Sequence, residues 1–125
     1  MLGSDKLVAF VGTLDQARAK EFYQHTLGLK FVSEDAFALV FDVAGTMLRV
    51  ATVPELRPAK FTVLGWQVAD IAAAANQLQR SGIKLERYEG IRQDETGIWS
   101  TPGGTKIAWF KDPDENILSL TQFGE

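Results

Sequence analysis

The same order of apolar runs and acidic residues occurs twice along the chain, and this internal repeat constrains the fold more than any other feature. The apolar run Leu7–Thr13 precedes Asp15, and the run Phe61–Val68 precedes Asp70. Each aspartate can accept hydrogen bonds from the free N–H groups of a helix's first turn. A helix-favouring stretch with one apolar side follows each aspartate. Each half is therefore expected to begin with a strand and a capped helix.

Both expected helices stop at a glycine, Gly28 in the first half and Gly82 in the second. Glycine takes the left-handed conformation that often ends a helix without a steric penalty. Strand patterns then follow in Ala36–Asp42, Thr46–Val53, Ile98–Ser100, Lys106–Lys111 and Ile117–Gln122. The order predicts an α+β fold in which two βαβββ modules form a cupped mixed sheet with the helices on the outside.

The chain of 125 residues suits a single domain. We expect module 1 to span about residues 6–53 and module 2 about residues 61–123. The segment between them, residues 54–60, contains two prolines and is predicted to be a linker.

Composition excludes several classes of protein. The net charge is −3 and no basic run is present, so we expect no nucleic-acid partner. The chain has no cysteine, which excludes thiolate metal sites and disulfides and suits a reducing compartment. No apolar stretch has the length of a signal peptide core or a membrane helix. These features predict a soluble, cytoplasmic protein with no membrane partner.

Three stretches carry a resemblance to a known family: Asp15–Leu29, Val63–Asp70 and Trp109–Asn116. In this order, together with the repeat, they resemble the vicinal oxygen chelate family, which includes glyoxalase I, bleomycin resistance proteins and extradiol dioxygenases. The resemblance covers nearly all residues from Lys6 to Phe123. One departure is Glu115, because the family usually has glycine at this place in the turn.

The resemblance also implies where a divalent metal would be bound in the family's enzymes. The four positions fall on Val8, Leu48, Val63 and Ser119, with Arg49 in place of Leu48 if the register shifts by one. None of these side chains is a good ligand for zinc, nickel, iron or manganese. The single histidine, His25, is expected on the exposed side of the first helix. We therefore expect no metal and no cofactor, although a site made only of carboxylates stays open.

Alternation along the strands indicates which side chains face the expected cavity between the sheets. Alternation places Phe10, Val63, Gln67 and Ser119 on this face, and the further candidate ligand-binding residues are Arg49, Trp99 and Trp109, with the tryptophans at the entrance of the cavity. Such a site suits a small, partly hydrophobic molecule, with the tryptophans stacking on a flat ligand and Arg49 pairing with an anion. Trp66 has the opposite parity and is expected to pack under a helix. The alternative is that these residues only fill a core between the sheets.

Three functions remain open from the sequence. The first is a metal-independent small-molecule-binding protein of the glyoxalase/bleomycin resistance type. The second is a lyase or dioxygenase-type enzyme with a divergent active site. The third is a scaffold or interaction protein with a filled core. Drug-resistance members of the resembled family hold their ligand between subunits, so the resemblance implies a homodimer.

Overall fold

The computed structural model describes residues 1–124, which divide into two compact units, Met1–Arg57 and the residues from Pro58 onward. We call these units module 1 and module 2. The division falls inside the predicted linker, in a stretch between Val53 and Val63 that contains no helix or strand. The described residues contain no helix that is long and apolar enough to cross a membrane.

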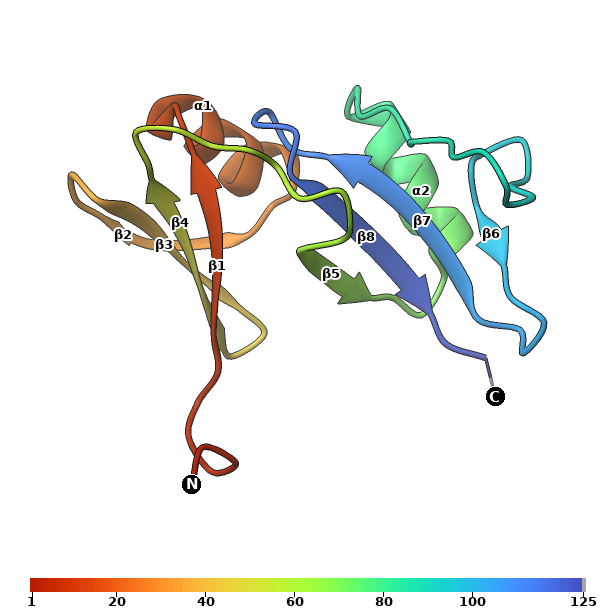
Figure 1. The fold of residues 1–125 in the computed structure, drawn as a ribbon, viewed down its shortest axis with the longest axis horizontal. Coiled ribbons are helices and arrows are strands. Elements are labelled where there is room, and N and C mark those ends of the chain that lie inside the picture. Colours follow the sequence, from red (N-terminus) through yellow and green to blue (C-terminus); the bar gives the residue numbers. More distant parts are fainter. Residues whose placement is uncertain (125) are drawn as a thin grey trace. The chain divides into compact units, whose positions relative to one another are not determined.

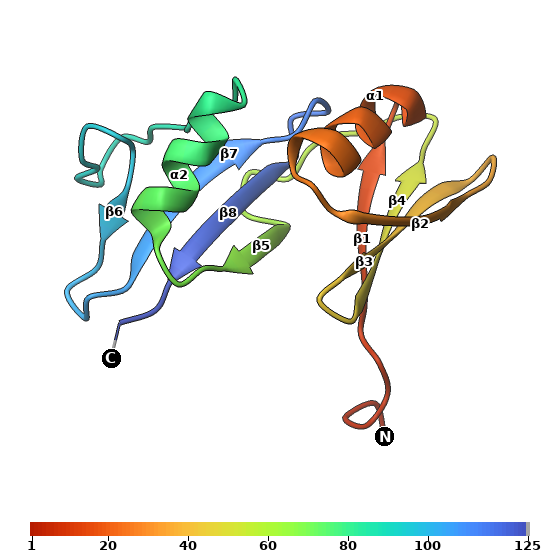
Figure 2. The same ribbon diagram turned by 180° about the vertical axis from the view of Figure 1, so that it is seen from behind.

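Module 1 is a four-stranded mixed sheet with a helix on one face (Figures 1 and 2). Its strands have the spatial order β1-β4-β3-β2; β1 is parallel to β4, and the other neighbours are antiparallel. Its elements are β1 (Val8–Thr13), α1 (Gln16–Lys20), η1 (Glu21–Thr26), β2 (Lys30–Glu34), β3 (Ala38–Val43) and β4 (Thr46–Thr52).

Module 2 repeats this topology with the strand order β5-β8-β7-β6, and β5 is parallel to β8. Its elements are β5 (Leu64–Gln67), α2 (Ile71–Arg80), β6 (Trp99–Ser100), β7 (Lys106–Lys111) and β8 (Ile117–Gln122). The α+β class and the two βαβββ modules predicted from the sequence are confirmed.

The predicted helix ends are also confirmed. The carboxylate of Asp15 accepts from the N–H of Arg18, and that of Asp70 accepts from the N–H of Ala73, each at 3.1 Å. Gly28 and Gly82 have φ values of 73° and 86°, which is the left-handed region. The first helix departs from expectation in one respect, because it widens into a π-helix, η1, from Glu21 onward.

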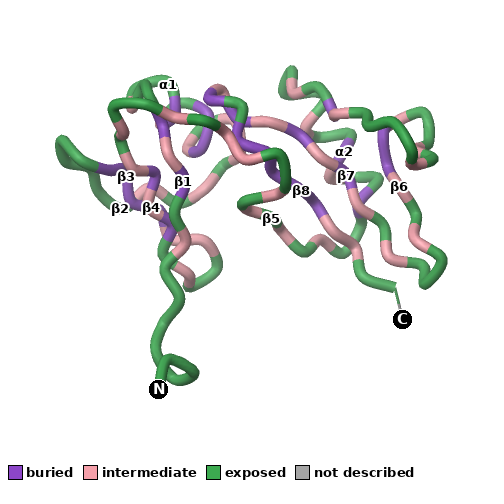
Figure 3. The backbone as a smooth tube through the Cα atoms, viewed as in Figure 1, coloured by how far each residue is buried: buried purple, intermediate pink, exposed green. Residues whose placement is uncertain are grey.

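The core of each module lies between its sheet and its helix, and Figure 3 marks the buried residues along the chain. In module 1 the buried residues on this side are Val11, Phe22, Tyr23, Leu39, Phe41, Leu48 and Val50. In module 2 they include Ile71, Ala75, Ala108, Phe110, Leu118 and Leu120. Trp66 stacks on Phe110 with ring centroids 6.3 Å apart, so its predicted place under the helix is confirmed. Burial of these apolar side chains is the main favourable term in folding.

Two tight turns place the neighbouring strands. Ala44 and Gly45 both have positive φ and join β3 to β4, as in two-residue hairpins that match the twist of the strands. The turn from β7 to β8 is organised by Asp112, whose Oδ1 accepts from the N–H groups of Asp114 and Asn116 at 2.9 Å each. Glu115 has a φ of 67°, so this turn holds a side chain in a conformation that favours glycine.

The sequence pattern does not predict the strand β2 (Lys30–Glu34). It is an exposed edge strand whose register shifts between Phe31 and Ser33, so it shows no regular alternation of apolar residues. In module 2 the corresponding strand β6 has only two residues, and a single bridge joins Gln93 to Trp99 beside it.

Candidate ligand-binding face

The side of the module 2 sheet that points away from α2 carries most of the candidate site residues. Strand alternation and register place these residues on it: Gly65, Gln67, Trp99, Ile107, Trp109, Lys111, Ile117, Ser119 and Thr121. We call this surface the open face of module 2. Val63 directly precedes β5, and its N–H donates to the carbonyl of Ile117 at 3.0 Å.

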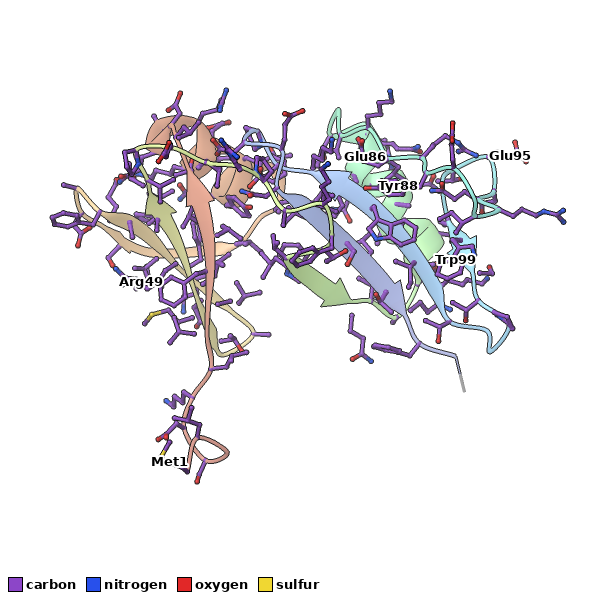
Figure 4. The ribbon with its side chains drawn as sticks, viewed as in Figure 1. Met1, Arg49, Glu86, Tyr88, Glu95 and Trp99 are labelled. Carbon is purple, nitrogen blue, oxygen red and sulfur yellow. The ribbon has the colours of Figure 1, made fainter. Side chains whose placement is uncertain are left out.

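Three aromatic rings form a continuous strip on this face. Trp99 and Trp109 stack with centroids 6.1 Å apart and planes at 25°, and Tyr88 meets Trp109 edge-on at 5.4 Å. Figure 4 shows Tyr88 and Trp99 among the side chains that lie near β6 and β7. We call these three residues the aromatic strip. Its rings are only partly buried, and Tyr88 is 38% exposed, so part of the strip is open to solvent.

The loop that carries Tyr88 is held by its own polar side chains. The amide of Gln93 donates to the carbonyls of Glu86 and Gly97 at 2.9 and 2.8 Å, and its oxygen accepts from the N–H of Tyr88 at 2.7 Å. The carboxylate of Asp94 accepts from three N–H groups at 2.9 Å, those of Thr96, Gly97 and Ile98. Asp94 therefore supports the conformation of this loop.

Charged groups flank the strip at the Tyr88 end. A hollow of about 420 Å³ adjoins Tyr88 and is lined by Pro58, Ala59, Lys60, Lys111, Glu115 and Ile117. The Lys111 ammonium lies 3.8 Å from the carboxylate of Glu86. Burial, and to a smaller extent the negative charge of Glu86, raises the pKa of Tyr88 above its usual value. A tyrosine phenol is already neutral at physiological pH at its usual pKa of about 10, so Tyr88 can take part in hydrogen bonds as a neutral group.

The corresponding face of module 1, on the side of its sheet that points away from its helix, is largely apolar. Phe10 pairs with Arg49 across β1 and β4, and Phe10 is 60% exposed. A hollow of about 290 Å³ on this module is lined by residues that include Val8, Val32, Val40 and Met47.

The pKa of Asp35 lies below its usual value, first because the N–H groups of Phe37 and Ala38 donate to its carboxylate and to a smaller extent because of the positive charge of Arg49.

One predicted position needs correction. Leu48 was placed on the inward face as a metal-ligand equivalent, but it is 1% exposed and packs on the helix side of the sheet. The register pairs Met47 with Val8 and Arg49 with Phe10, so Arg49 takes the open-face position. The physical reason is the period of two along a strand, because a shift of one residue moves a side chain to the other face.

The residues at the implied metal positions do not fit a divalent cation. Val8, Arg49 and Val63 offer no suitable donor atom, and Ser119 offers only a hydroxyl. Within residues 1–124, no three His, Cys, Asp or Glu side chains are grouped so that they could hold a metal ion. His25 is largely exposed and lies 3.9 Å from Glu21, one helical turn away.

Comparison with known proteins agrees with this fold. Residues 5–120 match the profile of the Glyoxalase/Bleomycin resistance protein/Dioxygenase superfamily. The chain belongs to this superfamily. No curated protein sequence gave a significant match.

Solved structures of the superfamily fold superpose over nearly the whole chain. An antibiotic-binding protein from a Streptomyces species is 27% identical, with a TM-score of 0.72 and 98% of each chain covered. A lactoylglutathione lyase from Agrobacterium tumefaciens is 16% identical, with a TM-score of 0.73 and 95% of this chain and 93% of that chain covered. A putative glyoxalase family protein from Bacillus anthracis is 15% identical, with a TM-score of 0.74 and coverages of 95% and 94%. At such identities the last two show the fold alone.

Two residues of the site were not among the candidates from the sequence. Tyr88 lies in a polar stretch that resembles an ordinary exposed loop, so no local pattern indicated its contact with Trp109. Gly65 has no side chain, so it was not among the candidate ligand-binding residues. A glycine inside a strand is a known signal for close approach of another group, and it could have drawn attention to this position.

Proposed function

We propose that the protein is a metal-independent small-molecule-binding protein whose ligand stacks on the open face of module 2. The observation that carries this proposal is the aromatic strip of Tyr88, Trp109 and Trp99. The strip is preformed because Gln93 and Asp94 hold the loop that positions Tyr88. A preformed site loses less conformational freedom when a ligand binds, which favours affinity.

The chemistry of the face favours binding of a flat, partly hydrophobic molecule. Indole rings offer large apolar faces that stack on aromatic ligands. Polar groups lie at the margins, where the phenol of Tyr88 and the ammonium of Lys111 can orient a ligand. Few polar groups around an apolar surface are typical of small-molecule sites.

The relative from Streptomyces supports the same proposal. That protein is described as antibiotic-binding, and it is more similar in sequence to this chain than the lyase is. The residues at the implied metal positions also favour binding over the metal-assisted chemistry of the enzymes, because they supply no ligand set. The homodimer and the cytoplasmic location expected from the sequence stay predictions.

Replacing Trp109 with alanine is expected to weaken binding of a flat aromatic probe about tenfold, because the central ring of the strip is lost. The probe is naphthalenesulfonate, which is flat and soluble, and its dissociation constant is measured by isothermal titration calorimetry. Phe123→Ala is the matched control, since Phe123 is an exposed aromatic residue of module 2 outside the strip. Circular dichroism checks that both variants fold. If Trp109→Ala binds the probe as tightly as the unaltered protein does, the proposed site is wrong.

A further inference from the structure

One polar side chain on the open face of module 2 is buried and has no partner. Ser119 is 6% exposed, and no hydrogen bond to its hydroxyl is formed within residues 1–124. No fully enclosed side-chain oxygen or nitrogen of these residues lacks a partner, so the Ser119 hydroxyl keeps some access from outside. A hydroxyl removed from most of its water and left unpaired costs free energy, and a bound group that pairs with it recovers that free energy.

Gly65 keeps this hydroxyl accessible from the β5 side. Gly65 and Ser119 are direct neighbours in the register of β5 and β8. A Cβ atom at position 65 would lie 2.7 Å from the Ser119 Oγ, closer than such atoms approach one another. Any side chain here would therefore push the hydroxyl aside or cover it. The absence of a side chain at residue 65 leaves the hydroxyl in place.

Trp109 borders Ser119 on the other side. The register pairs Trp109 of β7 with Ser119 of β8, so Gly65, Ser119 and Trp109 form one row across the open face. An aromatic ring of a ligand that stacks on Trp109 would therefore have one edge near the Ser119 hydroxyl. None of these three residues is ionisable, so the row suits a neutral polar group better than a charged one.

We propose that the Ser119 hydroxyl forms a hydrogen bond with a ring hydroxyl or ring carbonyl of the ligand, and that Gly65 keeps the hydroxyl accessible. This inference rests on the proposed function and narrows its ligand class to flat aromatic molecules that carry such a group at the ring edge. A hydroxyl can donate to a carbonyl and can donate to or accept from another hydroxyl, so one side chain serves both groups.

The test compares naphthalenesulfonate with a set of hydroxynaphthalenesulfonates that differ in the position of the hydroxyl group. We expect the best hydroxylated compound to bind the unaltered protein about fivefold more tightly than the parent compound, as one added neutral hydrogen bond allows. Ser119→Ala removes the hydroxyl and Gly65→Ala displaces it, so each variant should lose this preference. For each variant the preference is the ratio of its own dissociation constants for the hydroxylated and parent compounds, so a change in its affinity for the parent compound does not affect the comparison.

Thr121→Val is the matched control, because Thr121 is the next hydroxyl-bearing residue of β8 on the same face. This variant should keep the preference. Equal binding of all compounds to the unaltered protein, or a preference that survives in Ser119→Ala, overturns the inference and leaves the proposed function intact. Failure of every compound to bind the unaltered protein contradicts the proposed function itself. Circular dichroism and the binding of the parent compound show that each variant is folded.

Discussion

Replacing Tyr23 with alanine is expected to lower the free energy of unfolding by about 3–5 kcal/mol, the range for removing a buried aromatic ring. Tyr23 is fully buried in module 1. Its ring lies 5.1 Å from that of Phe22 and 6.1 Å from that of Phe41 on β3. The alanine variant would leave a cavity between the π-helical turn and the sheet. Chemical denaturation followed by circular dichroism measures the loss.

Two variants of the same turn serve as controls for Tyr23. Tyr23→Phe keeps the ring and should lose much less stability than the alanine variant does. His25→Ala changes an exposed side chain in η1 and should stay within about 0.5 kcal/mol of the unaltered protein. A loss for Tyr23→Ala that is no larger than the loss for His25→Ala would show that the helix of module 1 does not pack as described.

Replacing Asp112 with alanine is expected to lower the free energy of unfolding by about 3 kcal/mol, because several buried donors lose their acceptor at once. The carboxylate is 5% exposed and accepts from the N–H groups of Asp114 and Asn116. Its second oxygen accepts from the side-chain amide of Asn116 at 2.8 Å. Denaturant titration of the purified variant gives the change.

The neighbouring Glu115 supplies the control for Asp112. Glu115→Gly relieves the positive φ without touching the carboxylate, so this variant should be as stable as the unaltered protein or slightly more stable. Asp112→Asn should fall between the two, because its amide NH₂ cannot accept from Asn116. If Asp112→Ala is as stable as Glu115→Gly, the carboxylate does not organise the turn.

Much of the fold could be predicted because its signals are local. An aspartate before an apolar helical pattern and a glycine after it give both ends of each helix, and the structure has both caps. The edge strand β2 could not be predicted in the same way. Its pairing with β3 depends on a bulge and on residues distant in sequence, and its side chains are mostly exposed. Tertiary pairing, and not local preference, makes it a strand.

For the candidate site, the alternation of side chains along a strand predicts only which side of the sheet a residue faces. Parity predicted that Ser119 faces inward, and the register of β7 and β8 places Trp109 beside it. The position of Leu48 was wrong because counting along a strand cannot detect a shift of one residue. The contact of Tyr88 with Trp109 depends on hydrogen bonds from Gln93 across a loop, and these have no regular sequence pattern.

Binding without a metal is the central claim, and it is tested most directly by titrating naphthalenesulfonate into protein treated with a chelator. The titration is repeated after adding zinc, nickel, iron or manganese, and the melting temperature is recorded for each sample. We expect one dissociation constant throughout and no rise in melting temperature with any ion, because no ligand set is present at the implied positions. A stoichiometric metal that raises the melting temperature, or binding that disappears with chelator, would contradict this account.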